Sequence, residues 1–162
     1  MSQRSNALAD ALEAGARALA EFASTLTDEE WQSRLPEGRK VGVVVNHVAT
    51  VYPIEIQFAR SIAAGTPAGI TMPDINQMNS GHATDNDATS KEETLRLLAA
   101  NSAAAAAEIR SLTDAELDTV AAVPLYGNAT LTCQFILEDH AVRHSYHHLA
   151  RIQAGLARRA SA

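Results

Sequence analysis

Apolar residues recur at helical intervals along much of the chain, with polar residues at the positions between them. In residues 5–25, which Ser5 or Asn6 can cap, the apolar face is made of Leu8, Leu12, Leu19, Phe22 and Leu26. Residues 41–64 carry a second apolar stripe, made of Val44, Val48, Val51, Phe58 and Ile62. Both segments are therefore predicted to be long helices that pack through one face.

The second half of the chain carries two more long helical segments. A predicted helix over residues 90–111 opens with a capping box, and Thr130 can cap a last long helix over residues 130–158. Capping boxes at Thr27 and Thr113 each predict one short additional turn. The pattern as a whole predicts an all-α four-helix bundle with short extra helical turns.

Residues 65–89 are the least regular part of the sequence. They combine prolines and glycines with a polar run over residues 76–82. A loop this long inside a small domain is typical of a lid or a substrate-binding segment, and the alternative is a segment without fixed structure. The length of 162 residues and a hydrophobic share of 46% otherwise predict a single domain over residues 1–162.

The composition favours an all-α fold and argues against nucleic acid and membranes as partners. Alanine dominates the hydrophobic residues and only 4% of residues are aromatic, which favours closely packed helices over a sheet. A formal net charge of −6 makes nucleic acid an unfavourable partner. No apolar run is long enough to cross a bilayer, so no membrane association is expected. The start of the chain lacks the features of a signal peptide and the single Cys133 cannot form an intramolecular disulfide, so we expect a cytoplasmic protein.

Four of the six histidines lie within nine residues near the end of the chain. His140, His144 and His148 follow one another at four-residue intervals, so they share one face of a helix. Two imidazoles at this spacing can bind one metal ion, and the spacing alone does not decide which two. A third ligand has to come from another helix, because a catalytic metal ion typically has three protein ligands and an open position.

His47 is the histidine of the second predicted helix, and it lies on the apolar face of that helix with Val44, Val51 and Phe58. A metal site in the core of a bundle requires an inward-facing imidazole opposite a histidine pair. The sequence therefore predicts one divalent metal ion bound by His47 and by two of the late histidines.

Two short motifs resemble those of the DinB/YfiT-like superfamily. They are VVVNHV at residues 43–48 and HSYHHLARI at residues 144–152, and their order and their spacing of about one hundred residues also match that family. The resemblance implies a four-helix bundle whose metal ligands are His47, His144 and His148. Helical spacing leaves His140 as an alternate ligand in place of His148. The resemblance also implies zinc or nickel as the ion and a homodimer as a frequent assembly.

Three further residues are candidates for catalysis. Glu55 lies two turns after His47, where it can support a metal ligand or act as a general base; a solvated carboxylate at the edge of the bundle is the alternative. Arg151 lies two turns after His144 and can bind a substrate carboxylate, although a surface role fits equally well. His147 lies about 60° around the helix from His144, where it can contact solvent, the lid or a supporting carboxylate.

Four other residues are expected to have no direct part in metal binding or catalysis. His82 is expected on the surface of the 65–89 loop, and Asn76 and Asn79 of that loop can place polar groups over the site. Cys133 shares the His144 face of the last helix but lies about 16 Å along it, too far to bind the same ion. We therefore expect Cys133 to be a small core residue.

Three neutral imidazoles leave a divalent ion its full charge, which suits lowering the pKa of a bound thiol or water. Characterised members of the superfamily use thiols of the bacillithiol or mycothiol type, so the resemblance implies a metal-dependent thiol S-transferase with a small thiol and a small electrophile as partners. The same site with metal-bound hydroxide would make a hydrolase, and a noncatalytic metal-binding stress-response protein is the third hypothesis. Nothing in the sequence separates the three.

Overall fold

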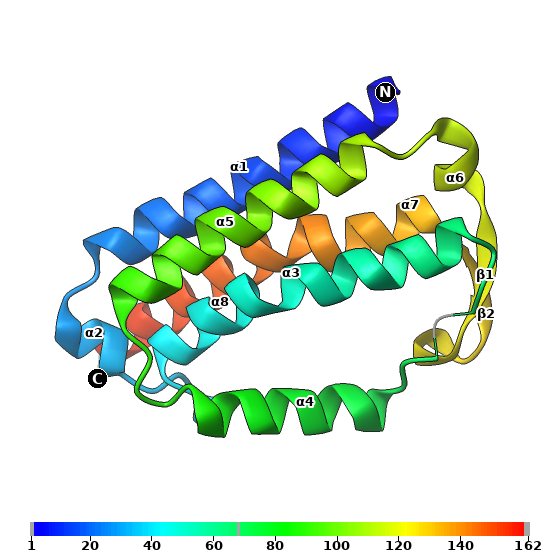
Figure 1. Ribbon diagram of the computed structural model, residues 1–162. Helices are drawn as coiled ribbons and strands as arrows, with labels where there is room; N and C mark the ends of the chain where they lie inside the picture. The colour runs from blue at the N-terminus through cyan, green and yellow to red at the C-terminus, as the bar shows by residue number, and fades with distance from the viewer. Residues whose placement is uncertain (1, 68, 161–162) are drawn as a thin grey trace.

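Four long helical columns form the body of the protein. The computed structural model describes residues 2–67 and 69–160. The columns are α1 (Gln3–Thr25), α3 (Val41–Ala63), α5 (Lys91–Arg110) and a last column that ends in α8 (Arg143–Ala160). α1 packs on α5 and α8, while α3 packs on α5 and on the last column (Figure 1). The predicted all-α four-helix bundle is therefore confirmed.

All four columns contribute to one hydrophobic core. Its largest fully buried side chains include Leu12, Leu19, Tyr52, Ile62, Leu98, Ile109, Ile136 and Ile152. The Tyr52 hydroxyl forms a buried hydrogen bond of 2.5 Å with the Ser145 hydroxyl, which ties α3 to α8 in the middle of the bundle. Within the described residues, no helix combines the length and the apolar composition that a membrane crossing requires.

The short predicted turns are present. α2 (Asp28–Gln32) and α6 (Asp114–Asp118) begin after Thr27 and Thr113, and both have the predicted capping boxes. The first helix begins two residues earlier than expected, with Ser2 as its cap in place of Ser5 or Asn6.

The expectation of an irregular loop over residues 65–89 is wrong, because this segment contains the helix α4 (Met72–Asp85). None of its residues is buried, so it lacks the apolar stripe by which the other helices were recognised. The sequence does contain a start signal for this helix, because Thr71 is followed by Pro73 and Asp74. In the structure the Thr71 backbone N–H donates to the Asp74 carboxylate at 2.9 Å. In Figure 1, α4 lies alongside α3 and runs in the opposite direction.

The last helix does not begin at Thr130, as the sequence predicted. Residues 120–132 form a hairpin of β1 (Val120–Val123) and β2 (Ala129–Thr132), joined by the single turn η1 (Pro124–Tyr126). The helical column starts after it with α7 (Cys133–Ile136), and the Thr132 hydroxyl caps it by accepting from the Phe135 N–H at 3.1 Å.

A six-residue π-helical segment, η2 (Leu137–Val142), joins α7 to α8. A π-helical turn holds more residues than an α-helical turn, so a residue within η2 does not stay on the four-residue ridge of the α-helix that follows. His140 lies within η2, whereas His144 and His148 lie in α8, so His140 leaves their ridge.

Candidate metal centre

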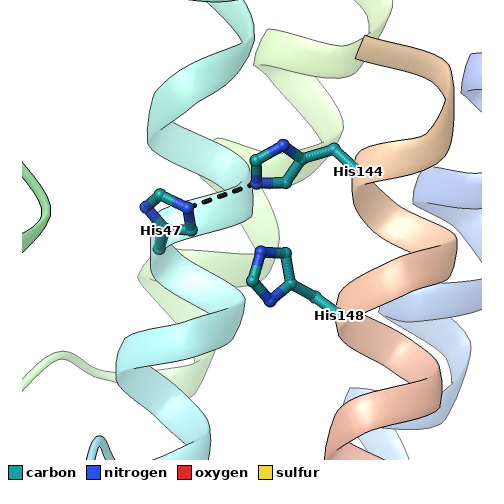
Figure 2. Close-up of side chains that lie close together, drawn as sticks. All are labelled: His47, His144 and His148. Carbon is teal, nitrogen blue, oxygen red and sulfur yellow. Dashed lines mark hydrogen bonds between the residues drawn. The ribbon is translucent and has the colours of Figure 1, made fainter. Parts of the chain in front are cut away.

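The three predicted ligands come together between α3 and α8. His47 extends from α3, and His144 and His148 extend toward it from successive turns of α8 (Figure 2). One ligand nitrogen from each ring can be chosen so that all three atoms lie within 4.8 Å of one another. The nearest pair is Nε2 of His144 and Nε2 of His47, at 3.2 Å.

These distances fit a shared divalent ion. Zinc–imidazole bonds of about 2.0–2.1 Å in a tetrahedral arrangement place two ligand nitrogens about 3.3 Å apart. The His144–His47 separation of 3.2 Å is close to that value. In addition, Nδ1 of His148 is buried and has no hydrogen-bond partner among the described residues. Two buried imidazoles and one half-buried imidazole, with such an unsatisfied nitrogen among them, have the composition and the spacing of a metal site.

Burial keeps two of these rings neutral. It lowers the pKa of His47 to about 3, and it moves the pKa of His148 further below the usual value for histidine. The neighbouring His144 lowers both pKa values as well, but less than burial does. Because metal ions bind neutral imidazole, neither His47 nor His148 has to lose a proton to coordinate an ion at pH 7.

Glu55 fixes the orientation of His144. Its Oε1 accepts from Nδ1 of His144 at 2.5 Å, which leaves the lone pair of Nε2 for the position between the three rings. Glu55 is buried, and its Oε2 has no hydrogen-bond partner among the described residues. The structure thus places Glu55 directly behind a candidate ligand, in agreement with one of the three roles considered for it.

His140 is not part of the group. It lies beside Phe58, with ring centroids 5.3 Å apart, and its Nε2 is 3.1 Å from the Tyr126 hydroxyl. Since that hydroxyl donates its proton to Asp139, the contact with His140 requires the imidazole to donate through Nε2. The structure therefore brings His148, rather than the alternate His140, to His47 and His144.

Two other candidates are not part of the group of three ligands. His147 is exposed, and its ring packs edge-on against that of His148, with centroids 5.2 Å apart. Arg151, in the middle of α8, is 44% exposed and pairs with Glu37 at 3.3 Å. Neither residue lines the cavity that reaches His47 and His144.

His82 is a neighbour of the site that sequence reasoning missed. It belongs to α4 and not to a surface loop, and its ring centroid is 5.6 Å from that of His47. Its Nε2 donates to Oδ1 of Asn46 at 2.8 Å, while Nδ2 of Asn46 donates to the hydroxyls of Thr89 and Thr94 at 3.1 Å. Asn46, directly before His47 in the sequence, could have signalled this network, because a buried amide requires several partners.

A cavity of about 390 Å³ opens beside the three rings, between α3, α4 and η2. His47, Glu55 and His144 belong to its wall, as do Ile75, Met78 and Asn79 of α4. Asn76 is exposed and is not among the lining residues. The segment predicted to be a lid therefore does cover the site, but as a helix.

The motifs around His47 and His144 can now be compared with known proteins. A family model described as the DinB superfamily matches residues 11–152, which include both motifs and all three histidines. The chain belongs to the DinB superfamily. The resemblance inferred from the two motifs is thereby confirmed.

A solved DinB-like structure, YfiT from Bacillus subtilis, has the same fold. It superposes with a TM-score of 0.78 at 22% sequence identity, over 99% of this chain and 90% of that chain. YfiT is described as "a probable metal-dependent hydrolase with an unusual four-helix bundle topology". No curated protein matches the chain significantly. Membership of the DinB superfamily and the bundle topology are thus established, and the activity has to be argued from the site.

Proposed function

We propose that this DinB-superfamily protein is a metal-dependent hydrolase of small molecules, with the ion held by His47, His144 and His148. The observation that carries the proposal is the meeting of three imidazoles, two of them buried, beside a cavity that His47 and His144 line. A buried carboxylate, Glu55, orients His144. A divalent ion held by three neutral imidazoles lowers the pKa of water and polarises a carbonyl oxygen.

The residues of the chain supply orientation and shielding from water. Glu55 holds the His144 ring through Oε1, and its Oε2 is buried without a hydrogen-bond partner among the described residues. The apolar wall, which includes Val51 and Phe58, limits the water around the reacting group. In this arrangement Glu55 acts on the ion through the ligand His144.

The charges of the cavity favour water over a thiol as the nucleophile. Among the described residues that line it there is no lysine or arginine, and Glu55 is the one acidic residue. A thiol cosubstrate that carries carboxylates, such as bacillithiol, would find no cationic partner there. The description of YfiT names hydrolysis as well. Thiol transfer and metal binding without catalysis remain the alternatives that the experiment has to separate.

The test starts from elemental analysis of the protein purified without a polyhistidine tag. We expect about one divalent ion per chain in the wild type, a several-fold lower content in His144→Ala, and no change in His147→Ala, whose side chain is exposed on the same helix. Equal metal content in the wild type and His144→Ala would contradict the proposed site.

Activity is then measured on the metal-loaded protein. We expect hydrolysis of neutral aryl esters that is lost on chelation and restored by zinc or nickel. Metal-dependent consumption of a small thiol together with monochlorobimane, without ester hydrolysis, would establish the thiol transferase instead. Inertness in both assays with metal bound would favour the noncatalytic protein.

A further inference from the structure

α4 covers one face of α3 without filling the space beneath it. The lining residues His47, Val51, Ile54, Phe58 and Ser61 lie on successive turns of the same face of α3, a length of about 21 Å. α4 lies over this face, yet none of its residues is buried. The space left between the two helices is the cavity of about 390 Å³.

The walls of this cavity differ between its two ends. The groups that bind or orient the candidate ion are His47, Glu55 and His144, and on α3 they occupy the part from residue 47 to residue 55. The end beyond residue 55 is lined by Phe58 and Ser61 of α3 and by Ile70. Over the whole cavity the apolar lining residues are Val51, Ile54, Phe58, Ile70, Ile75 and Met78. No cationic residue lies among the described lining residues, and the other polar ones are uncharged amide, hydroxyl and imidazole groups.

A cavity with such a wall disfavours the binding of a charged ligand. A carboxylate placed in the apolar part would lose its hydration without gaining an ion pair, and the chain's net charge of −6 would not favour it either. An apolar chain or ring in the same place would instead be removed from water by Phe58, Ile75 and Met78, of which Met78 is 41% exposed without such a partner.

We propose that the cavity binds the apolar body of an uncharged ligand, with the reacting group at the histidine end and an aliphatic or aromatic body extended along α3 toward Ser61. The position of the reacting group rests on the proposed hydrolase function. The binding of the apolar body rests on the cavity alone.

Chain length gives the first test, on the zinc-loaded full-length protein with p-nitrophenyl esters from acetyl to octanoyl. We expect kcat/KM to rise about threefold to fourfold per added methylene until the cavity is filled. Half-esters of dicarboxylic acids of equal length, which end in a carboxylate, should react at least about tenfold more slowly.

Binding of the neutral apolar dye Nile red gives a second readout that does not depend on activity. Ile75→Trp fills the cavity from α4, whereas Met72→Trp adds the same bulk to an exposed position on the same helix that does not line it. We expect Ile75→Trp to weaken Nile red binding at least about tenfold and to move the ester optimum to shorter chains. Met72→Trp should match the wild type, and both variants should keep the metal.

The outcomes separate the two proposals. If Nile red binds wild type and Ile75→Trp equally, or binds neither, the cavity does not hold an apolar body and the inference is overturned. A flat chain-length profile in an active enzyme overturns it as well. If no ester is hydrolysed but Ile75→Trp still blocks Nile red, the hydrolase proposal fails and the inference about the ligand stands.

Discussion

Glu55 determines how His144 can bind a metal ion. Its carboxylate accepts from Nδ1 of His144 at 2.5 Å, so the imidazole has its free lone pair on Nε2 and carries more electron density there. Three roles for Glu55 were open from the sequence: support of a metal ligand, a general base, or a solvated carboxylate at the edge of the bundle. Spacing alone could not decide, because residue 55 lies about 80° around α3 from residue 47 and its burial depends on α8.

We expect Glu55→Gln to weaken metal binding about tenfold to one hundredfold while the fold is retained. The amide can still accept the hydrogen bond, but the negative charge that strengthens the imidazole as a ligand is lost. Competition with a chromogenic chelator measures the affinity, and circular dichroism checks the fold. Glu29→Gln, at an exposed position of α2, is the control. An affinity equal to that of the wild type would mean that Glu55 does not act on the metal site.

Cys133 shows a residue whose role was predictable. It is fully buried in the core, as expected from its place on the last helical column, and burial raises the pKa of its thiol to about 11. We expect the native protein to react with a disulfide reagent at pH 8 at least about one hundredfold more slowly than the urea-unfolded protein. In the folded protein little of the Cys133 thiol is ionised, and the reagent does not reach its buried sulfur. Rapid labelling of the native protein would show that the column opens at α7.

At the scale of elements, side-chain hydrogen bonds connect the hairpin to η2. Tyr126 of η1 donates to Asp139 and contacts His140, so the hairpin holds two residues of the π-helical segment. Tyr126→Phe should lower the free energy of unfolding by about 1–2 kcal/mol, because it leaves the carboxylate and the imidazole without their shared partner. Urea unfolding monitored by tryptophan fluorescence measures the change. Metal content should not change; its loss would mean that η2 also positions His144.

Elements with a buried apolar stripe were predictable, and those without one were not. α1, α3 and α5 each place regularly spaced apolar residues in the core, and sequence periodicity reports this directly. α4 has no buried residue and was missed despite its capping signal at Thr71. The hairpin strands have four residues each, too few for a clear alternation. The π-helical segment leaves no mark in periodicity, so the helical spacing of His140 and His144 suggested an alternative ligand pair.

At the scale of the whole molecule, the buried histidines link stability to pH. In the unfolded chain His47 has an ordinary pKa near 6.5, whereas burial lowers it to about 3 in the folded protein, and His148 is lowered in the same direction. Between these values the unfolded state binds protons that the folded state does not. The free energy of unfolding therefore falls as the pH falls through this window, and it is fully restored above about pH 6.5.

We expect the metal-free protein, prepared with a chelator, to unfold at lower urea concentration at pH 5.5 than at pH 7.5. The variant His47→Asn should show a smaller difference because one of the titrating groups is gone. His147→Ala should reduce the difference less than His47→Asn does, because the exposed His147 ring is less desolvated and its pKa is lowered less. Added zinc should raise the midpoint at pH 7.5, since an ion that binds only the folded state stabilises it by mass action. Its effect should be similar at pH 5.5, because burial keeps His47 and His148 neutral in the folded state at both pH values. Equal midpoints at both pH values without metal would show that these rings are not buried as neutral bases, and the absence of any shift by zinc would show that they do not bind the ion.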